Sequence, residues 1–545
     1  THGNGINRYN YSTATFTNFT ADGSDGSISG NIIWKILEDN QGLLWIATQG
    51  TGFNIFDYNS NKFKRIVLDS SNPQDPSSNN VKDIFEDRAS VLWIGMFTGG
   101  IKKINRKPSQ FSSLKKIPNN TNSLPENFVY TMCEDTYGDI WIGTYSSLTR
   151  YLPLKDSFIN YPVNQPGENA VSGQRVRYIY RDSHNEIWIG TYFGKLNKYD
   201  RSTDSFKKYS LAFNYNAAEN SNVRVIYEDS KGYLWIGTNG NGLIKYDRLN
   251  NKLKIFDTKS SEISGDIVLS LIEDKKGNLW VGTFGRGLNK LSLEKWTFTH
   301  FKSDPDDELS LSDNSVTELF IDSKDNLWIG TFSGGLCRYD YNENNFKTFK
   351  EIDGLAGNYV SGILEDEHYN LWISTSKGIS RFSPGDSILN NFKNYNFTQG
   401  LQKGEFIPGA RLKTKNNIMY FGGVNGISYF HPDSLENTNN ISPVVITSFK
   451  IHNNEVNLSK NIVYSDTILL NYNENYFAFE FASLDYTYPE KNMYAYTLAG
   501  LDKNWNYSGS RRFASYTHLD PGEYEFKVKG TNSEGIWNEA GASII

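Results

Sequence analysis

Apolar and polar residues alternate along most of the chain in short segments, which are separated by glycine- and asparagine-rich turns. Around Trp235 such segments cover residues 223–227, 233–238, 243–247 and 253–256. A period of two residues is that of a β-strand, and it excludes a stack of helical repeats. The pattern therefore predicts units of four short strands joined by tight turns, such as the turn with Gly232.

One motif recurs at a constant phase in these units: an Asp, a short turn, Leu/Ile-Trp-Ile-Gly-Thr or a close variant, a glycine loop, and a strand that mostly ends in Tyr-Asp. A degenerate further copy has Tyr420 in the Trp place and Thr414 in the Asp place. Four strands in such a repeat are typical of a β-propeller blade. The copies follow one another every 44 to 48 residues, with Trp45, Trp93, Trp141, Trp188, Trp235, Trp280, Trp328 and Trp372 each six residues after Asp39, Asp87, Asp135, Asp182, Asp229, Asp274, Asp322 and Asp366.

The repeated Asp and Trp are expected to be structural. Residues that bind a ligand should differ between blades, whereas scaffold residues repeat. An Asp at the head of a turn accepts backbone N–H groups, and a Trp at constant phase packs between blades.

The number of blades predicts two rings. Residues 2–9 align with residues 239–246, so the sequence starts inside a blade, and preceding residues are expected to be missing. One partial blade and nine further ones exceed the usual maximum of eight in a ring. The segment 106–110 breaks the Tyr-Asp ending. We therefore expect residues 1–119 to be the last blades of a first propeller whose N-terminal part is absent, and residues 120–442 to be a second, seven-bladed propeller.

After residue 443 the repeat stops, and alternating Tyr, Phe and Val positions continue to residue 545. This pattern favours an immunoglobulin/fibronectin-like β-sandwich. The predicted fold class is therefore all-β, a seven-bladed β-propeller followed by a β-sandwich. An aromatic content of 14% and 46 glycines agree with many strands and turns.

Charge and cysteine content exclude several classes of function. The net charge is only −6, so the chain has no basic field for nucleic acid, and none is expected as a partner. No apolar run has the roughly 20 residues of a membrane helix, and the first residues do not resemble a signal peptide. Cys133 and Cys337 are too far apart for a disulfide framework or a metal cluster, which predicts two separate thiols.

The sequence predicts no catalytic residue, no metal site and no cofactor. The seven histidines are scattered, and His-Glu-x-x-His, Gly-x-Ser-x-Gly and P-loop motifs are absent. The acidic run 304–308 lacks the spacing of an EF-hand and is expected to be a solvated loop.

Two columns of the repeat vary between blades and give candidate ligand-binding residues. Five residues before the repeated Asp stand Trp34, Lys82, Tyr130, Arg177, Arg224, Leu269, Thr317 and Ser361. Two residues after the second-strand Gly, or Ala, stand Gln49, Phe97, Tyr145, Tyr192, Asn239, Phe284 and Phe332. Aromatic rings stack on sugars, and Arg binds carboxylates and sulfates. The candidates, which would suit an acidic oligosaccharide, are Trp34, Tyr130, Tyr145, Arg175, Arg177, Tyr192, Arg224, Phe284 and Arg286.

A structural alternative stays open for these residues. In a chain so rich in aromatic residues, the rings could pack between blades, and the arginines could pair with nearby surface acids.

The Asp-x5-Trp-Ile-Gly-Thr blades resemble the two-component regulator propeller repeat, and the tail with Tyr486, Tyr488 and Tyr494 resembles the three-tyrosine (Y_Y_Y) domain. Together they resemble the periplasmic sensor region of a Bacteroidetes hybrid two-component system. The resemblance implies two propellers and a sandwich, followed by a membrane helix after residue 545, a histidine kinase, and receiver and DNA-binding parts.

The resemblance also implies a function. Such sensors bind oligosaccharides from glycan breakdown, dimerise through the sandwich, and switch on polysaccharide-utilisation genes. This region would be non-catalytic and periplasmic, in an inner-membrane protein. The alternative is a propeller enzyme, such as a lyase acting on a polysaccharide or a cyclic peptide, because streptogramin lyases resemble these blades.

Overall fold

The structure is a computed structural model that describes residues 2–66, 79–105, 110–163, 165, 170–192, 195–211, 222–384, 391–435, 441–456 and 460–545. The chain divides into two compact units. One contains residues Ser109–Glu436, and the other contains Thr1–Pro108 together with Asn437–Ile545. Almost all regular structure is β-strand, as the alternation predicts, with short 3-10 turns η1 (Pro153–Lys155), η2 (Glu351–Asp353), η3 (Phe397–Gln399), η4 (Pro432–Ser434), η5 (Ile462–Tyr464) and η6 (Pro489–Lys491).

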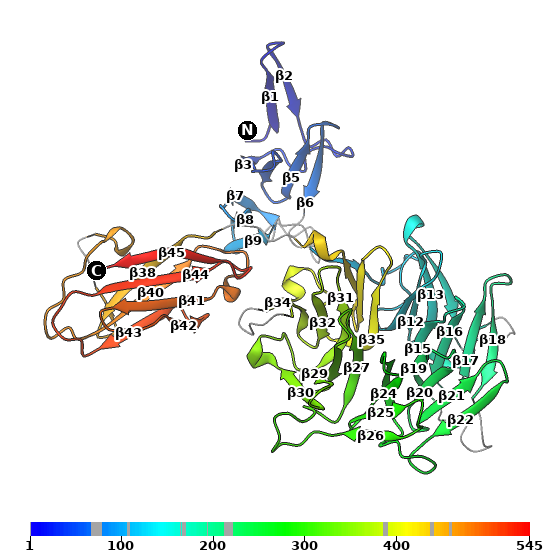
Figure 1. Cartoon of the computed structure of the whole chain (residues 1–545). Helices are drawn as coiled ribbons and strands as arrows, with labels where there is room; N and C mark the ends of the chain where they lie inside the picture. The colour runs from blue at the N-terminus through cyan, green and yellow to red at the C-terminus, as the bar shows by residue number, and fades with distance from the viewer. Residues whose placement is uncertain are drawn as a thin grey trace. The chain divides into compact units, whose positions relative to one another are not determined.

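The Ser109–Glu436 unit is a propeller of seven four-stranded sheets, each with its strands in sequence order except the last. Figure 1 shows β27, β31 and β35 toward the middle of this unit and β18, β22 and β26 at its rim. The first six blades are β11 (Val129–Glu134), β12 (Ile140–Thr144), β13 (Ser147–Leu152), β14 (Ser157–Pro162); β15 (Gln174–Arg181), β16 (Ile187–Tyr192), β17 (Lys195–Asp200), β18 (Ser205–Ser210); β19 (Val223–Glu228), β20 (Leu234–Thr238), β21 (Leu243–Asp247), β22 (Lys252–Phe256); β23 (Val268–Glu273), β24 (Asn278–Thr283), β25 (Leu288–Ser292), β26 (Phe298–Phe301); β27 (Val316–Ile321), β28 (Leu327–Thr331), β29 (Leu336–Asp340), β30 (Asn345–Phe349); and β31 (Val360–Glu365), β32 (Leu371–Thr375), β33 (Gly378–Phe382), β34 (Phe392–Tyr395).

The seventh blade closes the ring with a strand from its beginning. It consists of β35 (Phe406–Lys413), β36 (Met419–Gly423) and β37 (Gly426–Phe430), and its outer strand is β10 (Ser112–Leu114), which pairs with β37. The boundary expected at residue 120 therefore moves to Ser109, because β10 belongs to the ring that it closes. The backbone N–H of Lys415 also donates to Glu134 of the first blade, at 2.9 Å.

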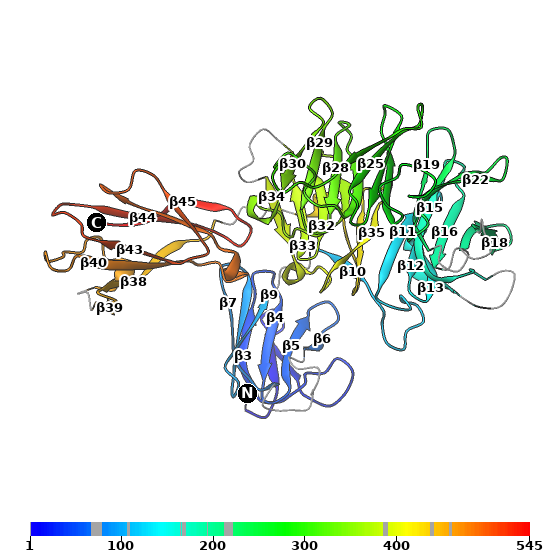
Figure 2. The same ribbon diagram turned by 90° about the horizontal axis from the view of Figure 1, so that it is seen from below.

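The N-terminal part of the other unit has the same blade architecture. Figure 2 shows the neighbouring strands of its complete sheet, β3 (Ile33–Glu38), β4 (Leu44–Thr48), β5 (Gly52–Asp57) and β6 (Lys62–Ile66). A three-stranded sheet follows, β7 (Val81–Glu86), β8 (Val91–Met96) and β9 (Ile101–Asn105). The hairpin of β1 (Ile6–Asn10) and β2 (Thr15–Phe19) is the outer half of a blade, because the bridge from His2 to Ile32 is equivalent to that from Asn239 to Ile267.

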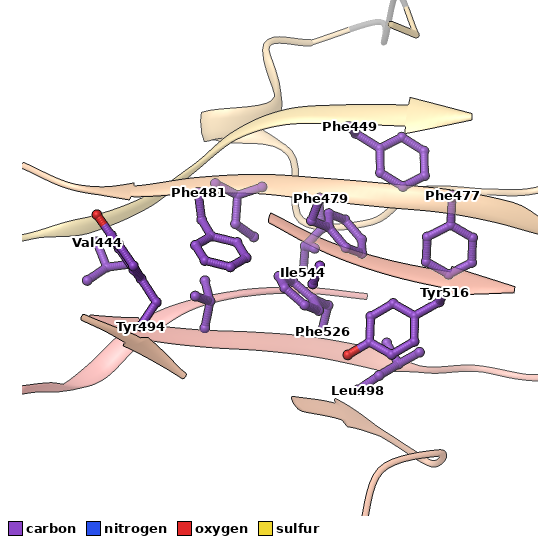
Figure 3. Close-up of a cluster of buried hydrophobic side chains, with 13 residues drawn as sticks. Val444, Phe449, Phe477, Phe479, Phe481, Tyr494, Leu498, Tyr516, Phe526 and Ile544 are labelled. Carbon is purple, nitrogen blue, oxygen red and sulfur yellow. The ribbon is translucent and has the colours of Figure 1, made fainter. Parts of the chain in front are cut away.

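The C-terminal part is a sandwich of two four-stranded sheets. One is β39 (Asn454–Glu455), β38 (Val444–Ile451), β40 (Tyr476–Ser483) and β43 (Phe513–Thr517), and the other is β42 (Asn506–Gly509), β41 (Tyr494–Ala499), β44 (Glu525–Thr531) and β45 (Trp537–Ile544). Figure 3 shows the side chains of the two sheets pointing toward one another. Phe479 stacks on Phe526 with ring centres 4.2 Å apart, so aromatic packing joins the sheets.

The repeated Asp is structural in all eight copies that have a Trp. One carboxylate oxygen accepts the indole N–H six residues later, at 2.5 to 3.1 Å. The other oxygen accepts two backbone N–H groups of the turn, for example those of Lys231 and Tyr233 on Asp229, at 3.0 and 2.9 Å. Trp235 itself is fully buried. One carboxylate thus fixes the turn and orients the ring that packs between blades.

A second set of contacts joins neighbouring blades at the same end of the ring. A serine directly after the repeated Asp donates its N–H and its hydroxyl to a glutamate that ends the inner strand of the next blade. These pairs are Ser183 with Glu228, Ser230 with Glu273, and Ser323 with Glu365, at 2.6 to 3.0 Å. Arg248 also reaches back to Asp182 of the preceding blade. The turns at this end of the ring therefore connect neighbouring blades.

The Asp229→Ala substitution should lower the free energy of unfolding of the propeller by about 3 kcal/mol, because it leaves a buried indole N–H and two turn N–H groups without acceptors. Urea unfolding followed by tryptophan fluorescence measures this change. The control is Asp200→Ala, which removes an exposed turn carboxylate that accepts from Ser202 and should change stability far less. Equal effects of the two substitutions would contradict the structural role.

Candidate functional site

The variable column of the repeat coincides with a β-bulge in each blade. The pairing of the first and second strands shifts by one residue between Val176 and Tyr178, and between Val223 and Val225. A bulge leaves a residue outside the ladder and re-aims its side chain. In the first six blades of the ring the residues at this place are Tyr130, Arg177, Arg224, Leu269, Thr317 and Ser361. The bulge therefore explains why this column tolerates different side chains.

Arg177 and Arg224 lie together on adjacent blades. Burial, and next the charge of Arg224, lower the pKa of Arg177 to about 10. The Nε atoms of both arginines are buried and have no hydrogen-bond partner, and neither guanidinium forms an ion pair with any carboxylate that the structure describes. Arg224 donates to the Asn239 side chain at 3.1 Å, and the Arg177 guanidinium lies 4.7 Å from the centre of the Tyr130 ring. Among the described residues, Arg177 and Arg224 therefore form no ion pair with a surface acid.

Arg175 joins the two tyrosines of the neighbouring loops. Its guanidinium carbon lies 4.0 Å from the Tyr145 ring centre and 5.2 Å from that of Tyr192, and it donates to the Tyr145 hydroxyl at 2.7 Å. Its φ of +36° is in the left-handed region, which is strained for a residue with a side chain. Such strain is concentrated at functional sites.

Aromatic rings from later blades complete the arrangement. Phe332 lies 4.8 Å from Tyr359 and 6.5 Å from Phe284, measured between ring centres. Phe284 and Phe332 are each 50% exposed, and Tyr145 is 47% exposed, so these residues are partly open to solvent. Burial, and next the charge of Glu405, raise the pKa of Tyr359, while the charges of Arg177 and Arg224 act in the opposite direction, which places Tyr359 within electrostatic range of Glu405 and of the arginine pair. We call Tyr130, Arg175, Arg177 and Arg224, with the rings of Tyr145, Tyr192 and Tyr359, the arginine site.

The remaining blades contribute little polar chemistry here. The Thr317 hydroxyl donates to the Val360 carbonyl at 2.6 Å, and the Ser361 hydroxyl donates to the Phe406 carbonyl at 2.9 Å. These two bulge residues therefore join blades and do not face a ligand. The arginine site is consequently one-sided, with cations on the second and third blades and apolar rings opposite.

Two candidates from the sequence lie apart from this group. Trp34 belongs to the other unit, where the ammonium of Lys82 lies 3.3 Å from the centre of its ring. Arg286 is exposed after Phe284, and its aliphatic stem packs against Gly265. Tyr359 is the main addition, and it occupies the same position relative to the repeated Asp366 as Arg175 does relative to Asp182.

The site combines cations and aromatic rings. No group of three or more metal-ligating side chains occurs in the ranges that the structure describes. Two neighbouring guanidinium groups that no described carboxylate pairs, near partly exposed aromatic rings, have the chemistry to hold an anion attached to a molecule with an apolar face.

Family models match both parts of the chain. Two component regulator propeller repeats match residues 27–50, 123–146, 170–193, 218–240, 261–285, 310–333 and 354–377, and the Y_Y_Y domain matches residues 485–545. In the described part of the chain, no helix is long and apolar enough to cross a membrane.

A protein described as histidine kinase P4, from Formosa agariphila, is 33% identical over 204 residues, which are 35% of this chain and 15% of the kinase. The extracellular domain of a putative hybrid two component system from B. thetaiotaomicron is 27% identical, with a TM-score of 0.75 over 99% of this chain and 70% of that one. A second such domain from that organism, 23% identical with a TM-score of 0.51 over 99% of this chain and 71% of its own, has a similar fold.

The Arg177→Met substitution should stabilise the ligand-free protein by about 1 kcal/mol, because it removes a desolvated charge next to Arg224. A pKa lowered to about 10 means that the folded protein disfavours the charged form. The penalty is therefore fully present at neutral pH and is relieved as the pH rises above about 10. Thermal unfolding at pH 7 measures the effect.

The matched control is Arg150→Met. Arg150 donates to Asp139 at 2.8 Å, so its loss leaves this partly buried carboxylate with only the more distant Arg201, at 3.8 Å, and should lower the melting temperature. A lower melting temperature for both variants would contradict the unpaired state of Arg177.

Proposed function

We propose that this chain, a sensor region of the Bacteroidetes two-component type with regulator propeller repeats and a Y_Y_Y domain, binds an acidic oligosaccharide at the arginine site. The observation that carries the proposal is the pair Arg177 and Arg224, two adjacent guanidinium groups without an acid among the described residues. A protein retains such a pair at the expense of stability where a ligand supplies the missing negative charge.

The aromatic residues favour a sugar as the carrier of that charge. The rings of Tyr145, Phe284 and Phe332 are partly exposed, and Phe332 packs on Tyr359 of the arginine site. Sugar rings have apolar faces that stack on aromatic side chains, and uronates or sulfate esters supply the acid. A simple inorganic anion would need the arginines but not the rings.

The proposed role of binding is signalling. The relatives are a histidine kinase and extracellular domains of two-component systems. We therefore place this region in the periplasm, in a hybrid histidine kinase and response regulator of the inner membrane. It would report oligosaccharides released during glycan breakdown and activate polysaccharide-utilisation genes. In this proposal the propeller region binds its ligand without chemical change.

Calorimetric titration of the intact chain tests the ligand class. Against a panel of uronate-containing, sulfated and neutral oligosaccharides, an acidic member should bind and raise the melting temperature. The double substitution Arg177→Met with Arg224→Met should weaken that binding by about 100-fold or more, since two charge-assisted contacts are lost. Arg150→Met should leave affinity unchanged. Binding that survives the double substitution, or product formation from the bound sugar, would overturn the proposal.

We also propose that the sandwich forms a homodimer whose arrangement responds to the ligand. Cys337 is buried, and burial raises the pKa of the Cys133 thiol to about 12, so neither native thiol is reactive. A single Ser543→Cys substitution at the exposed end of β45 therefore gives one crosslinking site per chain. Crosslinking yield should change by severalfold when the acidic oligosaccharide is added. Equal yields with and without ligand would argue against a ligand-dependent dimer.

A further inference from the structure

Three acidic residues on the loops at the arginine end of the ring are engaged within those loops. Each is the acceptor for a hydroxyl group of its own or a neighbouring loop. These pairs are Glu126 with Ser146, Asp266 with Thr258, and Asp313 with Ser333. All three carboxylates also accept the backbone N–H of the same residue, at 2.8 Å for Thr258 on Asp266 and for Ser333 on Asp313. These carboxylates stabilise loops and do not neutralise the arginine pair. Glu405 interacts with Tyr359 but is exposed.

A buried glutamate on an inner strand of the ring pairs with a different arginine. Glu318, which is only 4% exposed, forms an ion pair with Arg411 of the seventh blade. Arg411 follows an unusually long bulge in β35, where Gly409 has a φ of +82°. A Cβ atom on Gly409 would lie 3.6 Å from the Tyr178 ring, so the inner strands of two blades meet here.

This contact closes the ring just past the arginine pair. Tyr178 and Glu318 each directly follow a bulge residue, Arg177 and Thr317 respectively, so they lie one residue further along the inner strands. The Glu318–Arg411 ion pair and the approach of Gly409 to Tyr178 therefore lie on the far side of the arginine pair from the Tyr145 and Tyr192 loops. A ligand group that reaches Arg177 and Arg224 comes from the side of these loops, which a terminal group does most directly.

The third arginine is held by tyrosines. The Arg175 guanidinium lies over the Tyr145 and Tyr192 rings and donates to the Tyr145 hydroxyl. The arginines of this site with a buried Nε atom that has no hydrogen-bond partner are therefore the Arg177 and Arg224 pair, two positive charges on neighbouring side chains.

We infer that the arginine pair selects a doubly charged terminal group, two acidic functions on the last residue of the ligand or one dianionic group. A singly charged group would leave one desolvated guanidinium unbalanced, whereas two negative charges match both. This inference rests on the proposed function and narrows it, since it specifies the charge and the position of the recognised group.

Sulfate and methyl sulfate provide the test, because they present the same oxygen chemistry with two charges and with one. Each is titrated into the intact chain at a few millimolar, with ionic strength held constant by sodium chloride, so that general salting-out by sulfate is avoided. Sulfate should bind at least about tenfold more tightly than methyl sulfate, as expected for one additional charge contact. Thermal unfolding gives an independent reading of the same preference.

The single variants Arg177→Met and Arg224→Met each remove one of the two charges. In both, the ratio of the sulfate and methyl sulfate affinities should fall to about one, whereas Arg150→Met should preserve it. Equal affinities in the unsubstituted chain, or no sulfate binding, would overturn the inference. The oligosaccharide titration tests the proposed function separately. If an acidic sugar binds through Arg177 but sulfate and methyl sulfate bind equally well, only the inference of a doubly charged group is refuted.

Discussion

The carboxylate of the repeated aspartate is the interaction on which the propeller depends. In each blade with a tryptophan it accepts an indole N–H with one oxygen and two turn N–H groups with the other, so a single side chain couples the local turn to packing between blades. Arg248 adds a link from the third blade to Asp182 of the second. Because these acceptors are fully used, this end of each blade that has the aspartate has little freedom to vary. Variation is left to the opposite end.

At that opposite end, the bulge in each inner strand frees one side chain per blade from the requirements of the ladder. Where the freed residue is Thr317 or Ser361, its hydroxyl joins the next blade. Where it is Arg177 or Arg224, the charge finds no acid among the described residues, and the Nε atoms stay unpartnered. The same backbone irregularity thus joins blades in one case and, in the proposed function, binds a ligand in the other, depending on the side chain at that position.

How much of this follows from sequence depends on the range of the interactions. The Asp and Trp lie six residues apart, so their period predicts the blades, and the variable column predicts the bulge residues. The boundary at 120 is wrong because Ser112–Leu114, a three-residue strand without a motif, becomes an outer strand only by pairing with β37. Likewise, whether an arginine forms an ion pair with an acid depends on contacts between residues that are far apart in the sequence. Arg411 meets Glu318 across 93 positions of sequence, and no local pattern announces that pairing or its absence at Arg177.

An unbalanced charge pair is a liability in a static scaffold and an advantage in a sensor. A ligand that binds only the binding-competent conformation stabilises that conformation in proportion to the logarithm of the ligand concentration. The change in its population is larger when this conformation is less stable without ligand. Filling the pair with a protein carboxylate, as Glu318 does for Arg411, would stabilise the empty state and abolish that difference. At one end of the ring the aspartates hold the blades together, and at the other end the two arginines have no ion-pair partner among the described residues. Ligand binding can therefore change the stability of the arginine end while the aspartate end keeps the ring folded. On this argument, Arg177 and Arg224 matter to the proposed sensor because the protein itself leaves them unsatisfied.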